Sequence, residues 1–188
     1  HNGVIENYAS LRARLQTLGY VFRTETDTEA IAHLIAHHLE EQKKLDGDES
    51  CVQTCLKTVE ATMPKLKGTY GLVVLFRDCA EAMIVARAGS PLVIGVGKGE
   101  YFVASDAGPL VGYTDEVVYL SDHETALLTP QGIDLRHRDA GSRAPSIQTL
   151  DQVGSDVDLG GFEHYMLKEI FEQPHSIENA LRGRLDED

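Results

Sequence analysis

Apolar residues recur at helical spacing in the first third of the chain. The first helix is predicted from apolar positions separated by 4, 3, 4 and 3 residues: Val4, Tyr8, Leu11, Leu15 and Leu18. Gly19 follows where a left-handed cap ends a helix, and 20–22 is predicted to be a short strand. A second helix begins at Thr26, because Glu29 completes a capping-box pattern three residues later. A third helix ends at Pro64 and has an apolar face: Val52, Leu56, Val59 and Met63.

From Tyr70 onward the pattern changes to short apolar runs separated by Gly, Asp and Pro. Seven strands are predicted: 70–76, 82–86, 92–96, 101–103, 117–120, 125–128 and 133–135. Helices followed by a run of strands are typical of an α+β fold with largely antiparallel sheet. The two longest apolar runs do not alternate with polar residues, which indicates strands buried on both faces, as in layered sheets covered by helices.

The last quarter of the chain has a different composition. Residues 138–161 are rich in Gly, Ser and Asp with little periodic apolar content, which predicts a linker or a long surface crossing. Beyond it, 162–171 is predicted to be helical, Pro174 to break the helix, and 176–181 to resume it. The pattern therefore divides the chain into 1–137, 138–161 and 162–188.

Charge and cysteine content narrow the function classes. The 188 residues include 17 Lys and Arg against 30 Asp and Glu, a formal charge of −13, which disfavours nucleic acid and anionic membrane as partners. The apolar runs are also too short to span a membrane. Three cysteines cannot form a disulfide framework, which favours a reducing compartment, and we expect a cytoplasmic protein. The chain opens at His1 without a methionine, which suggests a fragment or a processed chain.

Some patterns resemble ligand sites but have a simpler interpretation. Two pairs lie one helical turn apart, Cys51 with Cys55 and His33 with His37. No Glu follows His33 directly, so the zinc-protease pattern is absent, and we favour structural roles for both pairs. The stretch 95–99 is rich in glycine, as phosphate-binding loops are. A strand rather than a helix is predicted after it, so a hairpin turn is the better interpretation.

Two polar segments are candidates for chemistry. The first is Asn2-Gly3, because an Asn amide and a Gly backbone N–H can together stabilise an oxyanion. The second contains Asp27, which lies in the first turn of a predicted helix and is suited to hold a substrate ammonium group. The residues alone leave an alternative open in each case: Asn2 as a turn or helix cap, and Asp27 as part of a cap.

These segments resemble the glutaminase domain of class II glutamine amidotransferases, which are N-terminal-nucleophile hydrolases with an αββα fold. The resemblance extends over essentially the whole chain and is carried by 1–8, 24–29, 87–92 and 104–106. The stretch 162–174 is similar to the junction into the sugar-isomerase domain in the glutamine–fructose-6-phosphate aminotransferase branch of the family. Relatives such as amidophosphoribosyltransferase share versions of the first motifs.

The resemblance implies a function and roles for named residues. It implies that glutamine is hydrolysed and that its ammonia serves glucosamine 6-phosphate synthesis. Asn2 and Gly3 match the oxyanion hole, while Gly3 and Asp27 match residues that bind glutamine. It implies a homodimer and a sugar-isomerase domain on the same polypeptide, and it implies neither a metal nor an organic cofactor.

One departure from the family bears on activity. The family's nucleophile is a cysteine at the mature N-terminus, and Cys51, Cys55 and Cys79 do not match it. We therefore expect a partial glutaminase domain that is inactive by itself. Two alternatives remain: a degenerate module that senses glutamine or serves assembly, and the glutaminase part of a class II amidotransferase with another acceptor.

Overall fold

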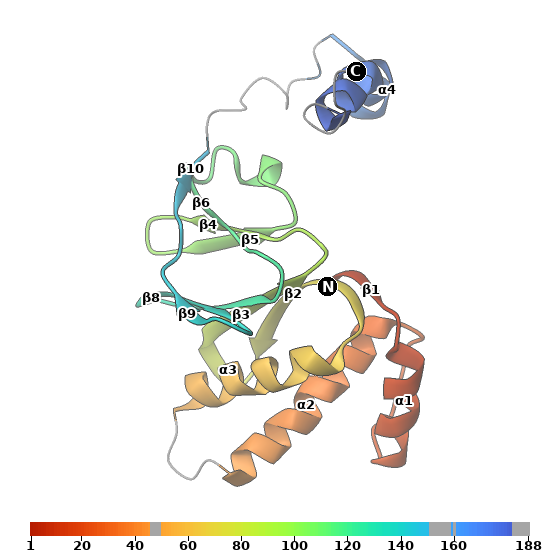
Figure 1. The fold of residues 1–188 in the computed structure, drawn as a ribbon, viewed down its shortest axis with the longest axis vertical. Helices are drawn as coiled ribbons and strands as arrows, with labels where there is room; N and C mark the ends of the chain where they lie inside the picture. Colours follow the sequence, from red (N-terminus) through yellow and green to blue (C-terminus); the bar gives the residue numbers. More distant parts are fainter. Residues whose placement is uncertain (46–49, 151–158, 160, 182–188) are drawn as a thin grey trace. The chain divides into compact units, whose positions relative to one another are not determined.

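The computed structural model describes residues 1–45, 50–150, 159 and 161–181. Contacts divide the chain into two compact units, His1–Leu150 and Asp151–Asp188. In the first unit, helices pack on a pair of antiparallel sheets (Figure 1). In the described part of the second, α4 (Tyr165–Leu181) is the main element.

Three helices make the first layer of the first unit. They are α1 (Tyr8–Thr17), α2 (Asp27–Leu45) and α3 (Cys51–Thr62). Gly19 ends α1 in the left-handed region, and its N–H donates to the Gln16 carbonyl while that of Tyr20 donates to the Leu15 carbonyl. This is the Schellman arrangement. The short 3₁₀ turn η1 (Met63–Lys65) contains Pro64 and follows α3 directly, so the predicted end of that helix is confirmed.

Six strands form the larger sheet in the order β1-β2-β3-β7-β8-β9, with every neighbouring pair antiparallel. Their bounds are β1 (Asn2–Ile5), β2 (Gly68–Phe76), β3 (Cys79–Ala88), β7 (Glu124–Thr129), β8 (Gly132–His137) and β9 (Gly141–Arg143). Strand β1 is an edge of this sheet within the described residues.

Four strands form the smaller sheet in the order β10-β6-β4-β5, also antiparallel. Their bounds are β4 (Val93–Val96), β5 (Tyr101–Ala104), β6 (Glu116–Tyr119) and β10 (Gln148–Thr149). A 3₁₀ turn, η2 (Gly108–Leu110), lies between β5 and β6. Strands β4 and β5 form a hairpin, in which the Gly97 N–H donates to the Glu100 carbonyl, so the hairpin interpretation of 95–99 is confirmed.

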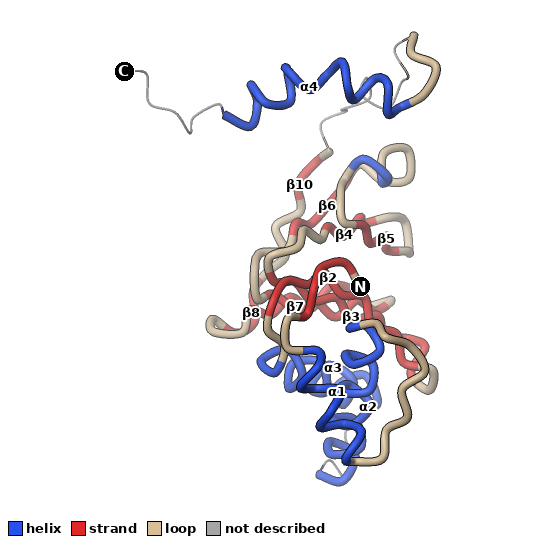
Figure 2. The backbone as a smooth tube through the Cα atoms, turned by 90° about the vertical axis from the view of Figure 1, so that its right-hand side faces the viewer, coloured by secondary structure: helices blue, strands red, loops and turns tan. Residues whose placement is uncertain are grey.

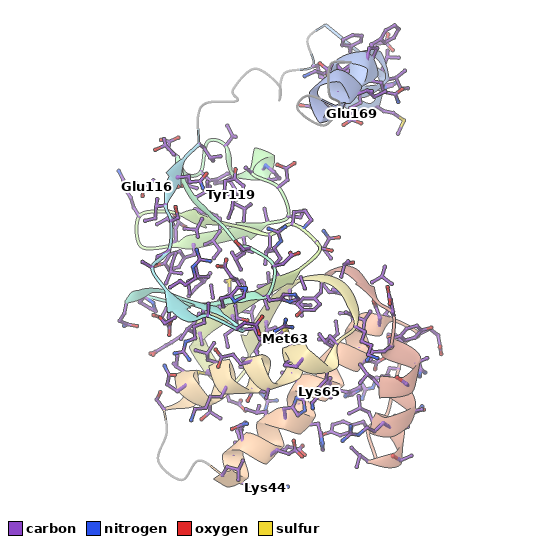
Figure 3. All side chains as sticks on the ribbon, in the orientation of Figure 1. Lys44, Met63, Lys65, Glu116, Tyr119 and Glu169 are labelled. Carbon is purple, nitrogen blue, oxygen red and sulfur yellow. A yellow bond between two sulfur atoms is a disulfide. The ribbon has the colours of Figure 1, made fainter. Side chains whose placement is uncertain are left out.

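The apolar cores follow the layers. One core lies between the helices and the six-stranded sheet and includes Leu15, Leu56 and Ile84. A second includes Ile94 of the smaller sheet and Leu128 of the larger one. Figure 2 shows α1, α2 and α3 on one side of the larger sheet and the smaller sheet on the other. In Figure 3, Met63 marks the start of η1, directly after α3, while Glu116 and Tyr119 mark the ends of β6.

The predicted α+β class with antiparallel sheets is confirmed, and all seven predicted strands are present. Two predictions near the N-terminus are wrong. Val4 lies in β1 and is exposed, so the first helix begins only at Tyr8. Residues 20–22 form no strand, because Tyr20 and Phe22 instead pack their rings against His33 of α2, with centroid distances of 5.3 and 4.6 Å.

Residues 138–150, which we expected within a linker or surface crossing, contribute β9 and β10 to the two sheets. Most of the remaining stretch, 151–158 and 160, lies outside the described residues. In the second unit, α4 continues through Pro174, so the predicted break there is wrong. A proline removes one backbone donor and commonly bends a helix, but the turns on either side keep their own bonds. No described helix is long and apolar enough to span a membrane.

A disulfide bond joins Cys51, at the start of α3, to Cys79, at the start of β3. Their Cα atoms are 6.1 Å apart, and Cys55 is a buried free thiol one turn along α3. The cysteine count argued against a framework of several bridges, but it did not anticipate this single bond. The count is therefore a weak guide to the redox state of the compartment.

Reduction of this bond is expected to lower the free energy of unfolding by about 3 kcal/mol. The cysteines are 28 residues apart, so the bridge removes substantial chain entropy from the unfolded state. Denaturant unfolding with and without dithiothreitol measures the effect. A Cys51→Ser/Cys79→Ser double variant is the control and should unfold identically in both conditions. Identical unfolding of the parent protein, with all three thiols titratable, would contradict the bridge.

Candidate active site

Strand β1 places Asn2 and Gly3 on the edge of the larger sheet. Gly3 lies opposite Tyr70 of β2 and has a φ of +125°, in the region that favours glycine. A Cβ atom at this position would lie 2.2 Å from the Thr69 carbonyl oxygen and 2.8 Å from Ser90 Oγ. The backbone at Gly3 is thus pressed against β2, and only a residue without a side chain fits there.

Asn2 does not cap a helix. It is exposed in β1 opposite Gly71, and the residue before α1 is Asn7. The Asn7 amide instead ties α1 to the start of β2, because Nδ2 donates to the Lys65 carbonyl at 2.9 Å and Oδ1 accepts from the Lys67 N–H at 3.0 Å. Lys65 is labelled in Figure 3. The helix-cap alternative for Asn2 is therefore ruled out.

Asp27 connects α2 to β1. Its Oδ2 accepts a hydrogen bond from the Ile5 N–H at 2.9 Å, while Oδ1 lies 3.7 Å from His1 Nδ1. The His1 ring also contacts the Thr28 hydroxyl, at 2.9 Å. The side chain that caps α2 is Thr26, whose Oγ1 accepts from the Glu29 N–H at 3.3 Å. One oxygen of Asp27 therefore has a structural partner on β1, and its side chain remains 22% exposed.

The turn before Asp27, residues 23–26, is held by two charged side chains. The Glu29 carboxylate accepts from the N–H groups of Arg23 and Thr24, both at 2.7 Å, and from the Thr24 hydroxyl at 2.6 Å. The Thr24 hydroxyl and then the backbone bonds stabilise the ionised form and lower the pKa of Glu29 to about 2. From α1, Arg12 Nη1 donates to the Thr24 carbonyl at 2.8 Å.

The turn between β3 and β4 completes the surroundings of Gly3. Its Gly89 has a φ of +74° and donates its N–H to Asp122 Oδ1 at 2.9 Å. Asp122 also lies 3.3 Å from Arg87 Nε, so one carboxylate anchors both ends of this short segment. Ser90 is consequently held with its hydroxyl against Gly3. The fourth segment of the resemblance, 104–106, lies elsewhere: Asp106 Oδ1 accepts from the Gly108 N–H at the start of η2.

The cysteines of the chain lie away from these residues. Cys51 and Cys79 form the disulfide, and burial raises the pKa of the Cys55 thiol. The three line a cavity of about 260 Å³ together with Lys43, which is sixteen residues beyond Asp27, or about 24 Å along α2. None of them is an accessible thiolate beside Asn2, Gly3 or Asp27.

Two larger hollows differ in their relation to the candidate residues. A groove of about 450 Å³ begins at His1 and Thr28 and continues between apolar residues of α2 and β2. A separate cavity of about 490 Å³ is lined by Tyr70 and by charged residues of β8, among them Arg136. Arg136 is already paired with Asp134 at 2.7 Å and with Glu60 at 3.6 Å. Asp27 itself lines neither hollow, but its neighbours His1 and Thr28 line the groove, which makes the groove the better candidate for substrate.

The structure brings together the two segments proposed from sequence, because the Ile5–Asp27 hydrogen bond links the strand of Asn2 and Gly3 to the helix of Asp27. Sequence reasoning missed Arg12 and Ser90, and it took Glu29 for a helix cap alone. The capping-box pattern was a signal for Glu29, but its carboxylate reaches back to Arg23 and Thr24 rather than to the Thr26 N–H. The segment 87–92 of the resemblance contains Ser90 but assigns it no role, and nothing in the local sequence marks Arg12.

Comparison with known proteins identifies the family of the chain. Residues 1–111 match the family model described as glutamine amidotransferase domain. Proteins named glutamine–fructose-6-phosphate aminotransferase (isomerizing) are similar over nearly the whole chain. One from Chlorobaculum tepidum is 43% identical over 98% of this chain, and one from Methanosarcina acetivorans is 41% identical over all of it. The chain spans 29% and 30% of those two proteins.

Solved structures show the same fold. The glutamine phosphoribosylpyrophosphate amidotransferase of B. subtilis, complexed with ADP and GMP, is 26% identical and aligns with a TM-score of 0.57 over 73% of this chain and 28% of that one. A structure described as the allosteric regulatory enzyme of purine biosynthesis is 28% identical with a TM-score of 0.55, over 73% of this chain and 27% of that one. The chain belongs to the glutamine amidotransferase domain family.

Proposed function

We propose that this chain is part of the glutaminase domain of a glutamine–fructose-6-phosphate aminotransferase. The observation that carries the proposal is the hydrogen bond from the Ile5 N–H to Asp27, which joins a glycine-containing edge strand to a carboxylate. His1 and Thr28, which lie next to that carboxylate, line a groove. The names of the similar proteins give glutamine as the amino donor and fructose 6-phosphate as the acceptor. The family resemblance adds that glutamine is hydrolysed and that its ammonia serves glucosamine 6-phosphate synthesis.

The proposed chemistry is acyl transfer through a thioester. A thiolate attacks the glutamine amide, and the negative charge that develops on the carbonyl oxygen needs donors that are already in place. We assign these donors to the Asn2 amide and the Gly3 N–H. Gly3 also lies against the bound glutamine, and Asp27 pairs with its α-amino group. Collapse of the tetrahedral intermediate breaks the C–N bond, and the protonated nitrogen leaves as ammonia. Water then hydrolyses the thioester to release glutamate and regenerate the thiol.

Other parts of the enzyme are assigned to polypeptide beyond residues 1–188. The nucleophile is one of them, since the cysteines of this chain are bonded or buried away from Asp27. The sugar-isomerase domain that binds fructose 6-phosphate is another, and the partial coverage of the relatives supports it. A homodimer and a cytoplasmic location stay predictions.

The whole function is tested on the full-length enzyme by measuring glutamate and glucosamine 6-phosphate formed from glutamine and fructose 6-phosphate. Both products are expected. No glutamate would favour a non-catalytic module that only binds glutamine or serves assembly. Glutamate without the amino sugar would favour an amidotransferase that uses another acceptor.

The Asp27→Asn variant of the full-length enzyme is expected to raise the KM for glutamine about 10- to 100-fold. The substitution keeps the side-chain volume and an oxygen for the Ile5 N–H, but it removes the charge that pairs with the ammonium group, which is worth about 1.5–3 kcal/mol. Steady-state kinetics measure the change, and a melting curve checks the fold.

Asp139→Asn is the matched control for that variant. Asp139 is exposed and pairs with Arg138, so its loss of charge should leave the KM for glutamine unaltered. A large drop in melting temperature with unchanged KM in Asp27→Asn would mean that Asp27 serves only to hold β1 against α2.

A further inference from the structure

The turn 23–26 receives more polar contacts than an exposed connection requires. Its residues are exposed, and it has no regular secondary structure. Yet the ionised carboxylate of Glu29 accepts hydrogen bonds from two of its backbone N–H groups and from the Thr24 hydroxyl. Hydrogen bonds from several donors to one charged acceptor are among the stronger hydrogen bonds in proteins. Here they hold a turn on the surface.

Arg12 holds the opposite side of the same turn. Its Nη1 donates to the Thr24 carbonyl at 2.8 Å, and its Nη1 and Nη2 donate to the Glu25 carboxylate at 3.1 and 3.2 Å. The guanidinium also lies over the Phe22 ring, 4.9 Å from its centroid. Thr24 therefore has its N–H and hydroxyl bonded by one helix and its carbonyl bonded by another.

The bonds of Glu29 differ from those of an ordinary capping box. In that motif the carboxylate at the third helical position reaches the N–H of the cap residue, which here is Thr26. Glu29 instead reaches residues 23 and 24, so it fixes the chain that leads into the helix. The Thr26 N–H is bonded to Thr24 Oγ1 at 3.3 Å, so this bond too depends on the position of Thr24. The next residue in the chain is Asp27.

We propose that Glu29 and Arg12 are positioning residues, which hold the turn 23–26 so that Asp27 presents its carboxylate to the α-amino group of glutamine. This inference rests on the proposed function of Asp27. The turn and the Ile5 N–H fix the carboxylate from two sides, so little conformational freedom is lost when the ammonium group binds. Neither residue touches the reacting amide, so their effect falls on glutamine binding rather than on the chemical step.

The test is the Glu29→Gln variant of the full-length enzyme. The amide keeps the volume but presents an NH₂ group to donors that need an acceptor, so part of the network is lost. The KM for glutamine is expected to rise about tenfold, with kcat changed less than about twofold. Glu40→Gln is the matched control, because Glu40 lies on the same helix and accepts from the Tyr20 hydroxyl, away from the turn. Its KM should equal that of the parent enzyme.

A substrate analogue distinguishes a misplaced Asp27 carboxylate from a general loss of order in the site. Glutaramate is glutamine without the α-amino group, so it makes no ion pair with Asp27. Glu29→Gln should leave the kcat/KM for glutaramate within about twofold of the parent value, while it lowers that for glutamine about tenfold. An equal loss with both substrates, or a fall in kcat at unchanged KM, would overturn the proposal.

Two further variants keep the inference distinct from the proposed function. If Asp27→Asn raises KM and Glu29→Gln does not, the positioning role fails while the function stands. If Asp27→Asn itself leaves the KM for glutamine unchanged, the proposed binding role of Asp27 is wrong, and the positioning role that rests on it is wrong too. Should Glu29→Gln not fold, Arg12→Lys keeps the charge but loses the forked contacts, and it is expected to raise the KM for glutamine about threefold with kcat unchanged. An unchanged KM in Arg12→Lys would overturn the proposal.

Discussion

Replacement of Asn2 by alanine in the full-length enzyme is expected to lower kcat about 10²- to 10³-fold. The Asn2 amide acts, in the proposed mechanism, on charge that appears only in the transition state, so its loss costs about 3–4 kcal/mol of activation free energy. The side chain is exposed on an edge strand and caps no helix, so the variant should keep its fold. The KM for glutamine should change little.

Single-turnover release of glutamate measures the chemical step directly. Asn7→Ala is the control, because it removes the same amide from a residue that bonds Lys65 and Lys67. It should lower the melting temperature and leave kcat nearly unaltered. If Asn2→Ala raises KM strongly at constant kcat, Asn2 contacts the ground-state substrate, and the oxyanion assignment is wrong.

Gly3→Ala is expected to destabilise the folded state by about 3–5 kcal/mol. Two costs add: an unfavourable φ of +125° for a residue with a Cβ, and overlap with the Thr69 carbonyl, which is backbone and cannot rotate away. Denaturant unfolding of the purified protein measures the free energy. Strand β1 would separate from β2, so glutaminase activity should fall with it.

Gly99→Ala provides the matched control for Gly3→Ala. Gly99 also has a positive φ, +79°, but no atom lies within 4 Å of the Cβ it would acquire. Its replacement should cost only about 1 kcal/mol, the backbone part of the effect. Equal destabilisation by the two variants would mean that β1 moves freely away from β2 and that the close approach at Gly3 has no energetic weight.

The strands that could be predicted are those with continuous apolar runs. The sequence 70–76 lies in a strand, and 97–100 is a hairpin turn between two strands, β4 and β5. Strand β1 was missed because its pairing partner, Gly68–Gly71, is more than sixty residues away, and because Val4 continues the helical spacing by coincidence. Tyr20 and Phe22 have strand composition, but they pack on α2 instead.

The candidate site likewise has residues that could be predicted from the sequence and contacts that could not. Asn2, Gly3 and Asp27 could be proposed because an amide, a backbone N–H of glycine and a carboxylate suit glutamine hydrolysis, and because the motifs resemble a family. The contacts that join these three residues could not be predicted from the sequence. Each of these contacts depends on tertiary structure: the Ile5–Asp27 hydrogen bond, the hydrogen bond from Arg12 to Thr24, and the packing of Ser90 on Gly3. The Cys51–Cys79 bond likewise requires α3 to lie against β3.

The bond from the Ile5 N–H to Asp27 also affects how molecules associate. An edge strand with free N–H and C=O groups invites a strand from another molecule to extend the sheet. On β1 one of those donors is already occupied, and the occupant places a negative charge on the open side of the strand. A second chain that approached Ile5 would have to displace a carboxylate from its backbone donor. Within the residues that the structure describes, Asp27 therefore disfavours intermolecular pairing at Ile5, while its side chain remains partly exposed.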